Sequence, residues 1–162
     1  MVRKDFCTVK QKNTSMKRLV CVVCGILMLA LAASAQIRKI PAAVTESFKS
    51  KYASATNVEW KDRLTSYVAT FEADGKKHEA YFDDDGSWKQ TETEIEETEL
   101  PAAVKDGFDK SKYTEWSIER VERIDKNDNV TEYRIQIKKG DVRKKNLLFT
   151  SDGRLKKDKI TV

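Results

Sequence analysis

Apolar residues recur at helical spacing in two separate stretches of the chain. In each stretch three apolar residues stand at positions i, i+4 and i+8, which places them on one side of a helix. The first set is Ile40, Val44 and Phe48, and the second is Leu100, Val104 and Phe108. Pro41 and Pro101 follow the first residue of each set, and proline costs no hydrogen bond in the first turn of a helix. The pattern therefore predicts two short amphipathic helices.

Alternation of apolar and polar residues follows each predicted helix. A period of two is typical of strands that bury one face. Residues 73–76 and 84–86 contain Asp-Gly pairs, which favour tight turns between strands. The inward positions are Val58, Trp60, Tyr67, Ala69, Phe71, Ala80, Phe82 and Trp88 after the first helix, and Ile118, Val121, Tyr133, Ile135, Ile137, Leu147, Phe149 and Leu155 after the second. We expect about four antiparallel strands after each helix.

An internal repeat underlies both patterns, and such self-similarity decides the organisation of a chain before any local feature does. Residues 40–48 recur as residues 100–108, with Pro-Ala-Ala-Val in both. Residues 81–88 align with residues 148–155, and each of these segments contains an Asp-Gly turn. The chain therefore contains two copies of one unit.

A unit of about 60 residues buries little surface and is marginal on its own. We therefore expect the two units to share a sheet or an interface. The sequence predicts an α+β fold of two tandem repeats, residues 36–99 and 100–162, each a helix followed by about four antiparallel strands. The helices are expected to pack on one face of the sheet.

The acidic segment of residues 91–99 joins the two units. Its β-branched residues predict an extension of the last strand of the first unit. We expect a solvated strand end that continues into a linker, and the alternative is a dedicated acidic ligand site.

The N-terminal segment has the three parts of a secretory signal. Lys17 and Arg18 precede the apolar run of residues 19–32, and Ala33-Ser34-Ala35 follows as a cleavage site. The run is shorter than the roughly 20 residues that span a bilayer, which disfavours the alternative of a retained anchor. We expect a cleaved signal peptide at residues 1–35, with Met16 as an alternative start of translation, and a periplasmic or secreted protein with no membrane anchor after cleavage.

Cleavage changes what the composition implies. It removes Cys7, Cys21 and Cys24, so disulfides, thiolate metal sites and cysteine nucleophiles are excluded from the mature chain. The whole chain has a net charge of +5, but the leader holds six basic residues and one acidic residue. The mature chain is therefore neutral, and a general nucleic-acid role is not expected.

The neutral mature chain is itself polarised. Residues 36–99 hold 9 basic and 14 acidic residues, whereas residues 100–162 hold 16 basic and 11 acidic residues. This separation of charge is expected to orient the units, steer a partner or promote head-to-tail association at low salt.

The repeated features resemble a known family. The paired Pro-Ala-Ala-Val helix starts, the aromatic-rich strands and the Phe-x-x-Asp-Gly turns at Phe82–Gly86 and Phe149–Gly153 resemble the PepSY-like domains of small exported bacterial proteins. These domains are similar to the β-lactamase-inhibitor-protein-like family, whose fold is a tandem repeat of a helix and a four-stranded antiparallel sheet. The resemblance implies a periplasmic or secreted protein with a binding or inhibitory role and no catalysis. The disulfides of the inhibitor have no counterpart in a mature chain without cysteine.

No residue pattern indicates an enzyme or a cofactor. His78 is the only histidine, and no G-x-S-x-G, G-x-G-x-x-G, P-loop or H-E-x-x-H motif is present. We expect His78 to be a surface residue rather than a general base, and we expect no catalytic residues and no cofactor.

No metal site is predicted either. A weak calcium site at Asp83 and Asp85 is the alternative to a hairpin turn, although an EF-hand register would place Tyr81 at its first ligand position.

The strand positions that alternate with the predicted core define a candidate binding face. An apolar or aromatic anchor inside a charged rim is typical of protein interfaces. The predicted partner-binding residues are Val68, Thr70, Glu79 and Tyr81 in the first unit and Arg134, Gln136 and Leu148 in the second. Strand addition at a sheet edge is another binding mode that fits this architecture.

These features predict an exported, non-catalytic binding module whose partner is an unidentified periplasmic or extracellular protein. A sharper form of the same hypothesis is an inhibitor of an enzyme such as a protease, acting through the exposed sheet face. The alternative from another class is a structural or stress-related envelope protein without a defined ligand, and a hydrolase is the third.

Overall fold

The computed structural model of the protein describes residues 39–161. The predicted signal peptide, residues 1–35, and the alternative start at Met16 lie outside the described residues. All described elements belong to one compact unit, Arg38–Val162. In chain order the elements are α2 (Ala42–Lys51), β1 (Thr56–Arg63), β2 (Ser66–Ala73), β3 (Lys76–Phe82), β4 (Trp88–Ile95), the 3-10 helix η1 (Glu97–Glu99), α3 (Ala102–Asp109), β5 (Ser117–Lys126), β6 (Thr131–Lys139), β7 (Arg143–Thr150) and β8 (Leu155–Thr161).

The two helices begin where the sequence predicts. Pro41 and Pro101 are the residues that precede α2 and α3, and their carbonyl oxygens accept hydrogen bonds from the first turn. Proline fits there because the first helical N–H groups have no partner within the helix. The buried residues are Val44 and Phe48 in α2 and Val104 and Phe108 in α3. This matches the predicted apolar sides of both helices.

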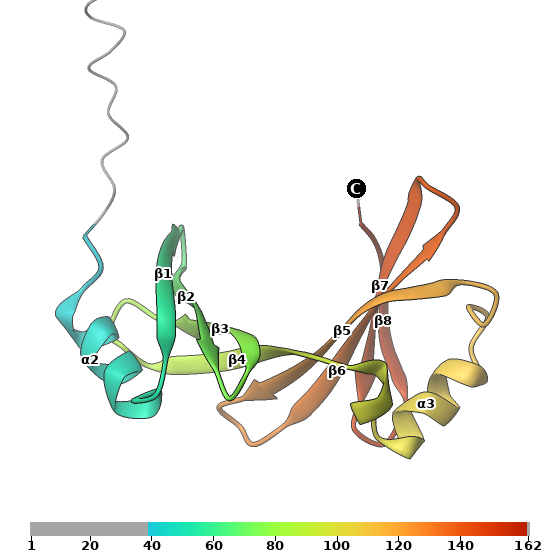
Figure 1. Ribbon diagram of the computed structural model, residues 1–162, viewed down its shortest axis with the longest axis horizontal. Helices are drawn as coiled ribbons and strands as arrows, with labels where there is room; N and C mark the ends of the chain where they lie inside the picture. The colour runs from blue at the N-terminus through green and yellow to red at the C-terminus, as the bar shows by residue number, and fades with distance from the viewer. Residues whose placement is uncertain (1–38, 162) are drawn as a thin grey trace, which may run out of the picture. The chain divides into compact units, whose positions relative to one another are not determined.

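The eight strands form one antiparallel sheet in the order of the sequence, β1 to β8 (Figure 1). Asp74 and Gly75, with φ angles of 51° and 71°, form the two-residue turn between β2 and β3. Two positive φ angles are typical of the tight turns that match the twist of a hairpin. With α2 and α3 among residues 39–161, the fold is α+β, as the sequence predicts.

The predicted extension of the last strand of the first unit is confirmed, because β4 continues to Ile95, but the expected solvation of this strand end is wrong. The strand β4 pairs with β3 on one side and with β5 on the other, so it lies in the middle of the sheet. Thr91 and Thr93 are buried, and so is Glu92. Glu94 is exposed, and so is the short segment after Ile95, where η1 leads into Leu100 and α3. An acidic sequence is thus buried because its strand has neighbours on both sides.

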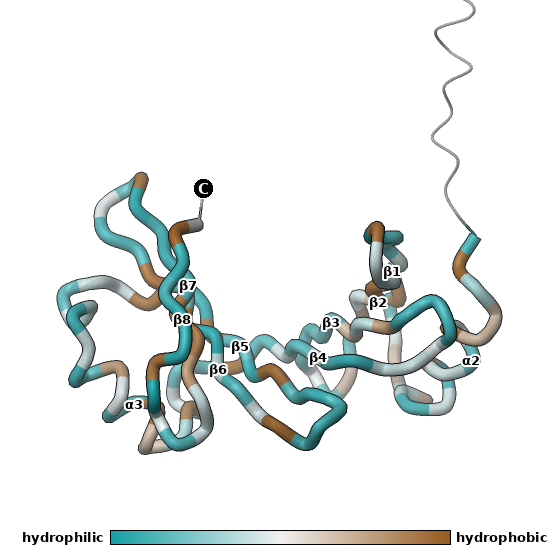
Figure 2. Tube along the Cα trace, turned by 180° about the vertical axis from the view of Figure 1, so that it is seen from behind, coloured by the Kyte–Doolittle hydropathy of each residue, from teal (hydrophilic) through white to brown (hydrophobic). Residues whose placement is uncertain are grey.

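Two hydrophobic clusters form the core. One combines α2 with β2 and β3, and the other combines α3 with β5, β6 and β7. In Figure 2 apolar segments of the strands and helices alternate with polar ones along the trace. The buried members are Val44, Phe48, Tyr67, Ala69, Phe71, Ala80 and Phe82 in the first cluster, and Ile95, Leu100, Val104, Phe108, Tyr113, Val121, Tyr133, Ile135, Ile137, Leu147 and Phe149 in the second.

Strand register places the sheet residues of both clusters on the same face. Directly opposed residues of an antiparallel pair share a face. Ala80 pairs with Thr91 of β4, and Ile95, on the same side of β4 as Thr91, pairs with Val121. The alternating residues of all eight strands form the other face, which we call the polar face.

Two glycine turns lie against the helices. Gly86 follows β3 and Gly153 follows β7, with φ angles of 87° and 85°. A Cβ atom at Gly86 would lie 2.6 Å from the carbonyl oxygen of Ala43, and one at Gly153 would lie even closer to that of Ala103. These positions therefore need glycine for the positive φ and also for the close approach to a helix.

Candidate functional site

All seven predicted partner-binding residues lie on the polar face. In the first half Val68 pairs with Tyr81, and Thr70 pairs with Glu79. In the second half Arg134 pairs with Leu148, and Gln136 pairs with Asn146. Each of these residues alternates with members of the hydrophobic clusters, which follows from the period of two along a strand.

The seven residues do not form one continuous patch. Those of the first half lie on β2 and β3 and those of the second half lie on β6 and β7, so β4 and β5 separate them. Val68 is 0% exposed, and its side chain therefore offers no contact surface. It is paired with Lys61 on one side and Tyr81 on the other. The other six residues are partly exposed.

An ionic network crosses the polar face where β4, β5 and β6 run side by side. The Arg134 guanidinium donates hydrogen bonds to both carboxylate oxygens of Glu92, at 2.7 and 2.9 Å, and to Glu122 at 2.7 Å. Glu122 also pairs with Arg120 at 3.2 Å. The hydrogen bonds to Glu92 are the main reason why the pKa of Arg134 is raised above its ordinary value, so the guanidinium stays charged. The Arg134 side chain therefore forms its hydrogen bonds with carboxylates of β4 and β5 of the same sheet.

A second ionic cluster surrounds Glu132 on β6. The Glu132 side chain is buried, and it accepts hydrogen bonds from Lys126 at 2.6 Å and from Lys156. Burial raises the pKa of this carboxyl, but the hydrogen bonds and charges of the two ammonium groups outweigh burial and leave the pKa below its ordinary value. Glu132 therefore holds Lys126 of β5 and Lys156 of β8 over the intervening strands.

Tyr81 is the aromatic residue of the predicted face. It is half-buried, and its hydroxyl donates a hydrogen bond to Glu79 Oε2 at 3.0 Å. Burial and the nearby carboxylates of Glu92 and Glu79 raise the pKa of its phenol. The ring therefore presents a neutral hydroxyl at any physiological pH.

A hollow of about 510 Å³ lies over the second half of the polar face. Leu148 and Arg134 contribute to its lining, as do Lys157 and Lys159 of β8, and neither lysine forms an ion pair with any residue between 39 and 161. The remaining lining residues are Gln90, Ile124, Lys126, Glu132, Asn146 and Ile160. The hollow thus combines apolar side chains with an excess of positive charge.

Two polar atoms of this face lack a hydrogen-bond partner within the described part of the chain. They are Oγ1 of Thr70 and Oδ1 of Asn146, and both are buried. A buried polar atom without a partner costs about 1–3 kcal/mol. Asn146 lines the hollow, so a hydrogen-bond donor of a bound partner could reach its Oδ1 and remove this cost.

His78 is not the surface residue that the sequence predicts. Its ring stacks on Phe71, with ring centroids 5.1 Å apart, and is partly buried. Nε2 lies 3.0 Å from the carbonyl oxygen of Ala73, and Nδ1 lies 3.0 Å from Thr93 Oγ1. A carbonyl only accepts, so Nε2 carries the proton. Both ring nitrogens are therefore occupied in holding β2, β3 and β4 together.

The candidate calcium ligands take part in a turn. Asp83 forms an ion pair with Lys89 at 2.9 Å, and Asp85 Oδ1 accepts a hydrogen bond from the Ser87 amide at 2.8 Å. The Gly86 amide donates to the carbonyl of Asp83 at 3.0 Å, which closes the predicted turn. Within residues 39–161 no three His, Cys, Asp or Glu side chains are grouped to hold a metal ion.

The pattern of the sequence does not reveal the central contacts of the polar face. Glu92 stands in the acidic segment that was expected to be solvated, yet it is the main partner of Arg134. The contact requires β4 and β5 to pair across the junction of the two units, and no local feature of a single sequence specifies that pairing. The available signal was the expectation that the two units share a sheet, because pairing the last strand of one unit with the first strand of the other is one way to join them.

The comparison with protein families identifies the chain. Residues 65–157 match the family model described as "Putative beta-lactamase-inhibitor-like, PepSY-like". This chain belongs to the PepSY-like family. The matched range begins in the first half and ends in β8, so it covers both groups of predicted partner-binding residues. No curated protein shows significant similarity to the chain.

Solved structures of similar fold come from Bacteroides. A protein of Bacteroides fragilis described as BLIP-like is 31% identical, with a TM-score of 0.68 and coverage of 76% of this chain and 87% of that chain. A Bacteroides eggerthii protein described as "putative periplasmic" is 25% identical, with a TM-score of 0.71 and coverage of 75% and 89%. A DUF2874 family protein of Bacteroides ovatus is also 25% identical, with a TM-score of 0.71 and coverage of 75% and 88%.

These similarities support a non-catalytic module of the BLIP-like type. No helix in the described part of the chain is both long and apolar enough to cross a membrane. On the polar face Arg134 and Lys126 are paired with carboxylates of other strands, whereas Lys157 and Lys159 of the hollow form no ion pair within residues 39–161.

Proposed function

We propose that this PepSY-like protein is an exported, non-catalytic module that binds another protein through its polar face. The hollow beside Leu148 carries the proposal, because it joins apolar side chains with lysines that have no ion-pair partner within residues 39–161. Charge without an internal partner is available to a partner of opposite charge. The partner surface that fits is acidic with an apolar side chain at its centre.

The rest of the face is suited to the rim of such an interface. Tyr81 and Glu79 of β3 are partly exposed, and β4 and β5 separate them from Arg134 and Leu148. Tyr81 pairs with Gln90, which lines the hollow. The network formed by Arg134, Glu92 and Glu122 keeps the strands between them in fixed positions. A rigid surface loses little conformational entropy on binding, which favours affinity.

The domain organisation that supports this function is a cleaved signal peptide at residues 1–35 and two tandem repeats at residues 36–99 and 100–162. Each half has the same order of one helix and four strands. Gly86 and Gly153 approach Ala43 and Ala103 in the same way, which supports equivalent helix positions on one face of the sheet. The periplasm or the cell exterior is the location we propose.

Inhibition of an enzyme, for example a protease, is the specific form of binding that the family description suggests. The support is that the matching family is described as beta-lactamase-inhibitor-like and that the chain is 31% identical to a BLIP-like protein. An inhibitor needs a preformed surface, and the ionic network described above provides one. The alternative is a structural or stress-related role in the envelope without a defined ligand. The hollow disfavours this alternative, because its apolar side chains and its lysines without an ion-pair partner are suited to binding another protein.

The proposal is tested by capture from a periplasmic extract with three immobilised versions of residues 36–162. We expect the wild type and a control variant, Glu46→Ala/Asp109→Ala on the outer sides of the helices, to retain the same protein. The variant Tyr81→Ala/Leu148→Ala should lose that protein while keeping the circular dichroism spectrum of the wild type. Equal recovery by both variants would mean that binding uses another surface.

A further inference from the structure

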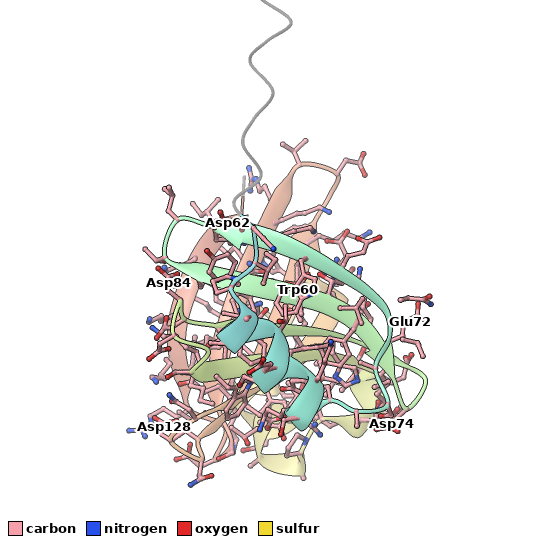
Figure 3. The ribbon with its side chains drawn as sticks, turned by 90° about the vertical axis from the view of Figure 1, so that its left-hand side faces the viewer. Trp60, Asp62, Glu72, Asp74, Asp84 and Asp128 are labelled. Atoms are coloured by element: carbon pink, nitrogen blue, oxygen red, sulfur yellow. The ribbon has the colours of Figure 1, made fainter. Side chains whose placement is uncertain are left out.

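A second hollow lies on the other side of the sheet, between α2 and β1. It has a volume of about 560 Å³, within the range of pockets that bind small molecules. Most of its lining is aromatic or aliphatic, and Figure 3 shows Trp60 beside α2. The lining residues are Thr45, Phe48, Lys49, Tyr52, Ala53, Ala55, Val58 and Trp60.

The second half of the chain has a different side chain at the position that is equivalent to Ala55 of the hollow. A Lys-Tyr pair stands near the end of each helix. Lys51 is the last residue of α2 and Tyr52 follows it, and Lys112-Tyr113 comes shortly after α3. The amide of Ala55 donates to the carbonyl of Tyr52 at 3.1 Å, and the amide of Trp116 donates to the carbonyl of Tyr113 at 2.9 Å. This shared hydrogen bond makes Ala55 and Trp116 equivalent positions in the two halves.

The two equivalent side chains differ greatly in size. The indole of Trp116 packs against the second hydrophobic cluster and meets the ring of Tyr113 edge to face, with centroids 5.7 Å apart. Ala55 offers only a methyl group beside Tyr52. The first half therefore has no aromatic side chain at the position where the second half has Trp116, and Ala55 at this position lines the hollow.

The charge of the lining adds a second requirement. Lys49 is the only charged residue among the described residues that line the hollow, and it forms no ion pair within residues 39–161. A ligand with a negative group near its aromatic ring would therefore find a complementary charge at the rim.

We propose that the hollow between α2 and β1 binds a small aromatic carboxylate, with its ring beside Ala55 and its carboxylate at Lys49. This site is separate from the proposed protein-binding face, because Phe48 and Trp60 belong to the cluster on the helix side of the sheet. The ring gains its binding energy from the buried apolar and aromatic surface of Tyr52, Phe48 and Trp60.

The probes for a test are indole and indole-3-acetate, titrated into ¹⁵N-labelled residues 36–162 and followed by amide chemical shifts. We expect both probes to shift the amides of Ala55 and Val58. Indole-3-acetate should bind up to about fivefold more tightly than indole, which is the effect of one exposed ion pair. The variant Lys49→Gln should remove this difference and keep the binding of indole.

Two further variants use the equivalence of the halves. Ala55→Trp should fill the hollow and abolish binding of both probes, with a melting temperature at or above that of the wild type as the check of folding. Trp116→Ala should open a matching site in the second half, because apolar cavities of this kind bind small aromatic molecules. The variant Tyr81→Ala/Leu148→Ala should bind both probes as the wild type does, which separates this site from the polar face.

The proposal is overturned if neither probe shifts the amides around Ala55 while the Trp116→Ala variant binds indole. It is also overturned if folded Ala55→Trp still binds, or if Lys49→Gln leaves the preference for the carboxylate unchanged.

Discussion

Single residues at the glycine turns connect the repeat in the sequence to the packing of the helices. Gly86 and Gly153 are the glycines of the two repeated Phe-x-x-Asp-Gly segments, and their positive φ angles are part of what the sequence predicts. Their second role, the contact with Ala43 and Ala103 at the start of each helix, becomes visible only in three dimensions. The turn after the third strand of each half therefore fixes the position of a helix.

The substitution Gly153→Ala tests this role. Gly140 is the matched control, because its φ is 63° and nothing lies within 4 Å of a Cβ atom placed there. Gly140→Ala should lower the free energy of unfolding by about 1–2 kcal/mol, the cost of a positive φ for alanine. Gly153→Ala should cost about 1–3 kcal/mol more, because the methyl group meets the backbone of Ala103. Urea unfolding measures both, and equal losses would contradict the contact.

The buried carboxylate of Glu132 predicts a dependence of stability on pH. Its pKa in the folded protein lies below the ordinary value of 4.5. A lowered pKa in the folded state means that the stabilisation is complete above the pKa of the unfolded chain and is lost as the pH falls through the folded pKa. The contribution of Glu132 should therefore be constant at neutral pH and should decline below about pH 4.5.

The variant Glu132→Gln measures this contribution. We expect it to lower the free energy of unfolding at pH 7 by about 1–3 kcal/mol, the range for loss of a buried hydrogen-bonded partner. The difference from the wild type should shrink as the pH is lowered through 4. Glu46→Gln, at an exposed position of α2, serves as the control and should change stability by less than about 0.5 kcal/mol at every pH. A difference for Glu132→Gln that stays constant in acid would contradict the assigned pKa.

At the scale of elements, the pairing of β4 with β5 makes one sheet from two marginal halves. The sheet residues of the two clusters share one face, and Ile95 of β4 belongs to the cluster of the second half. A half of about 60 residues buries little surface and is marginal by itself. The described residues should therefore unfold as one cooperative unit.

The three tryptophans allow this cooperativity to be tested. Trp60 and Trp88 lie in the first half and Trp116 lies in the second. The variant Trp116→Phe reports only on the first half, and Trp60→Phe/Trp88→Phe reports only on the second. In each variant the urea midpoint from fluorescence should equal that from circular dichroism of the same variant. Midpoints that differ between the two probes would show that the halves unfold separately.

The helices, the strands and most of the inward residues could be predicted because each follows from a local period in the sequence. The expected inward positions Val58 and Leu155 are instead exposed, because each lies beside an irregularity in the pairing of an edge strand. Phe48, Tyr67 and Phe149 are buried as expected. Three features could not be predicted. The burial of Glu92 depends on a distant strand pairing, the burial of Val68 depends on flanking side chains from two other strands, and the two hydrogen bonds of His78 depend on contacts across β2, β3 and β4. Each of these depends on which side chains of different strands meet, and the period of a single strand does not specify that.

At the scale of the whole molecule, opposite charges lie on the two halves. Residues 36–99 have an excess of five acidic residues, and residues 100–162 have an excess of five basic residues. Such a polarity attracts the basic half of one molecule to the acidic half of another over distances up to the Debye length, about 30 Å at 0.01 M salt and 10 Å at 0.1 M. The same field would steer an acidic partner to the hollow at Leu148.

Light scattering of residues 36–162 over a series of salt concentrations tests the effect of this polarity. We expect the average mass to exceed that of the monomer at 10 mM salt and to fall to the monomer value by about 150 mM, where screening shortens the interaction. A mass that does not change with salt would contradict head-to-tail association.

The central claim is that the polar face is the surface that meets another protein. Its most direct test is photo-crosslinking with benzoylphenylalanine placed at Leu148, at Tyr81, or at Glu46 on α2 as a control, in residues 36–162 added to an extract of the producing cell's envelope. We predict that the same partner is crosslinked from Leu148 and from Tyr81 and not from Glu46. A partner crosslinked only from Glu46, or from none of the three positions, would contradict the claim.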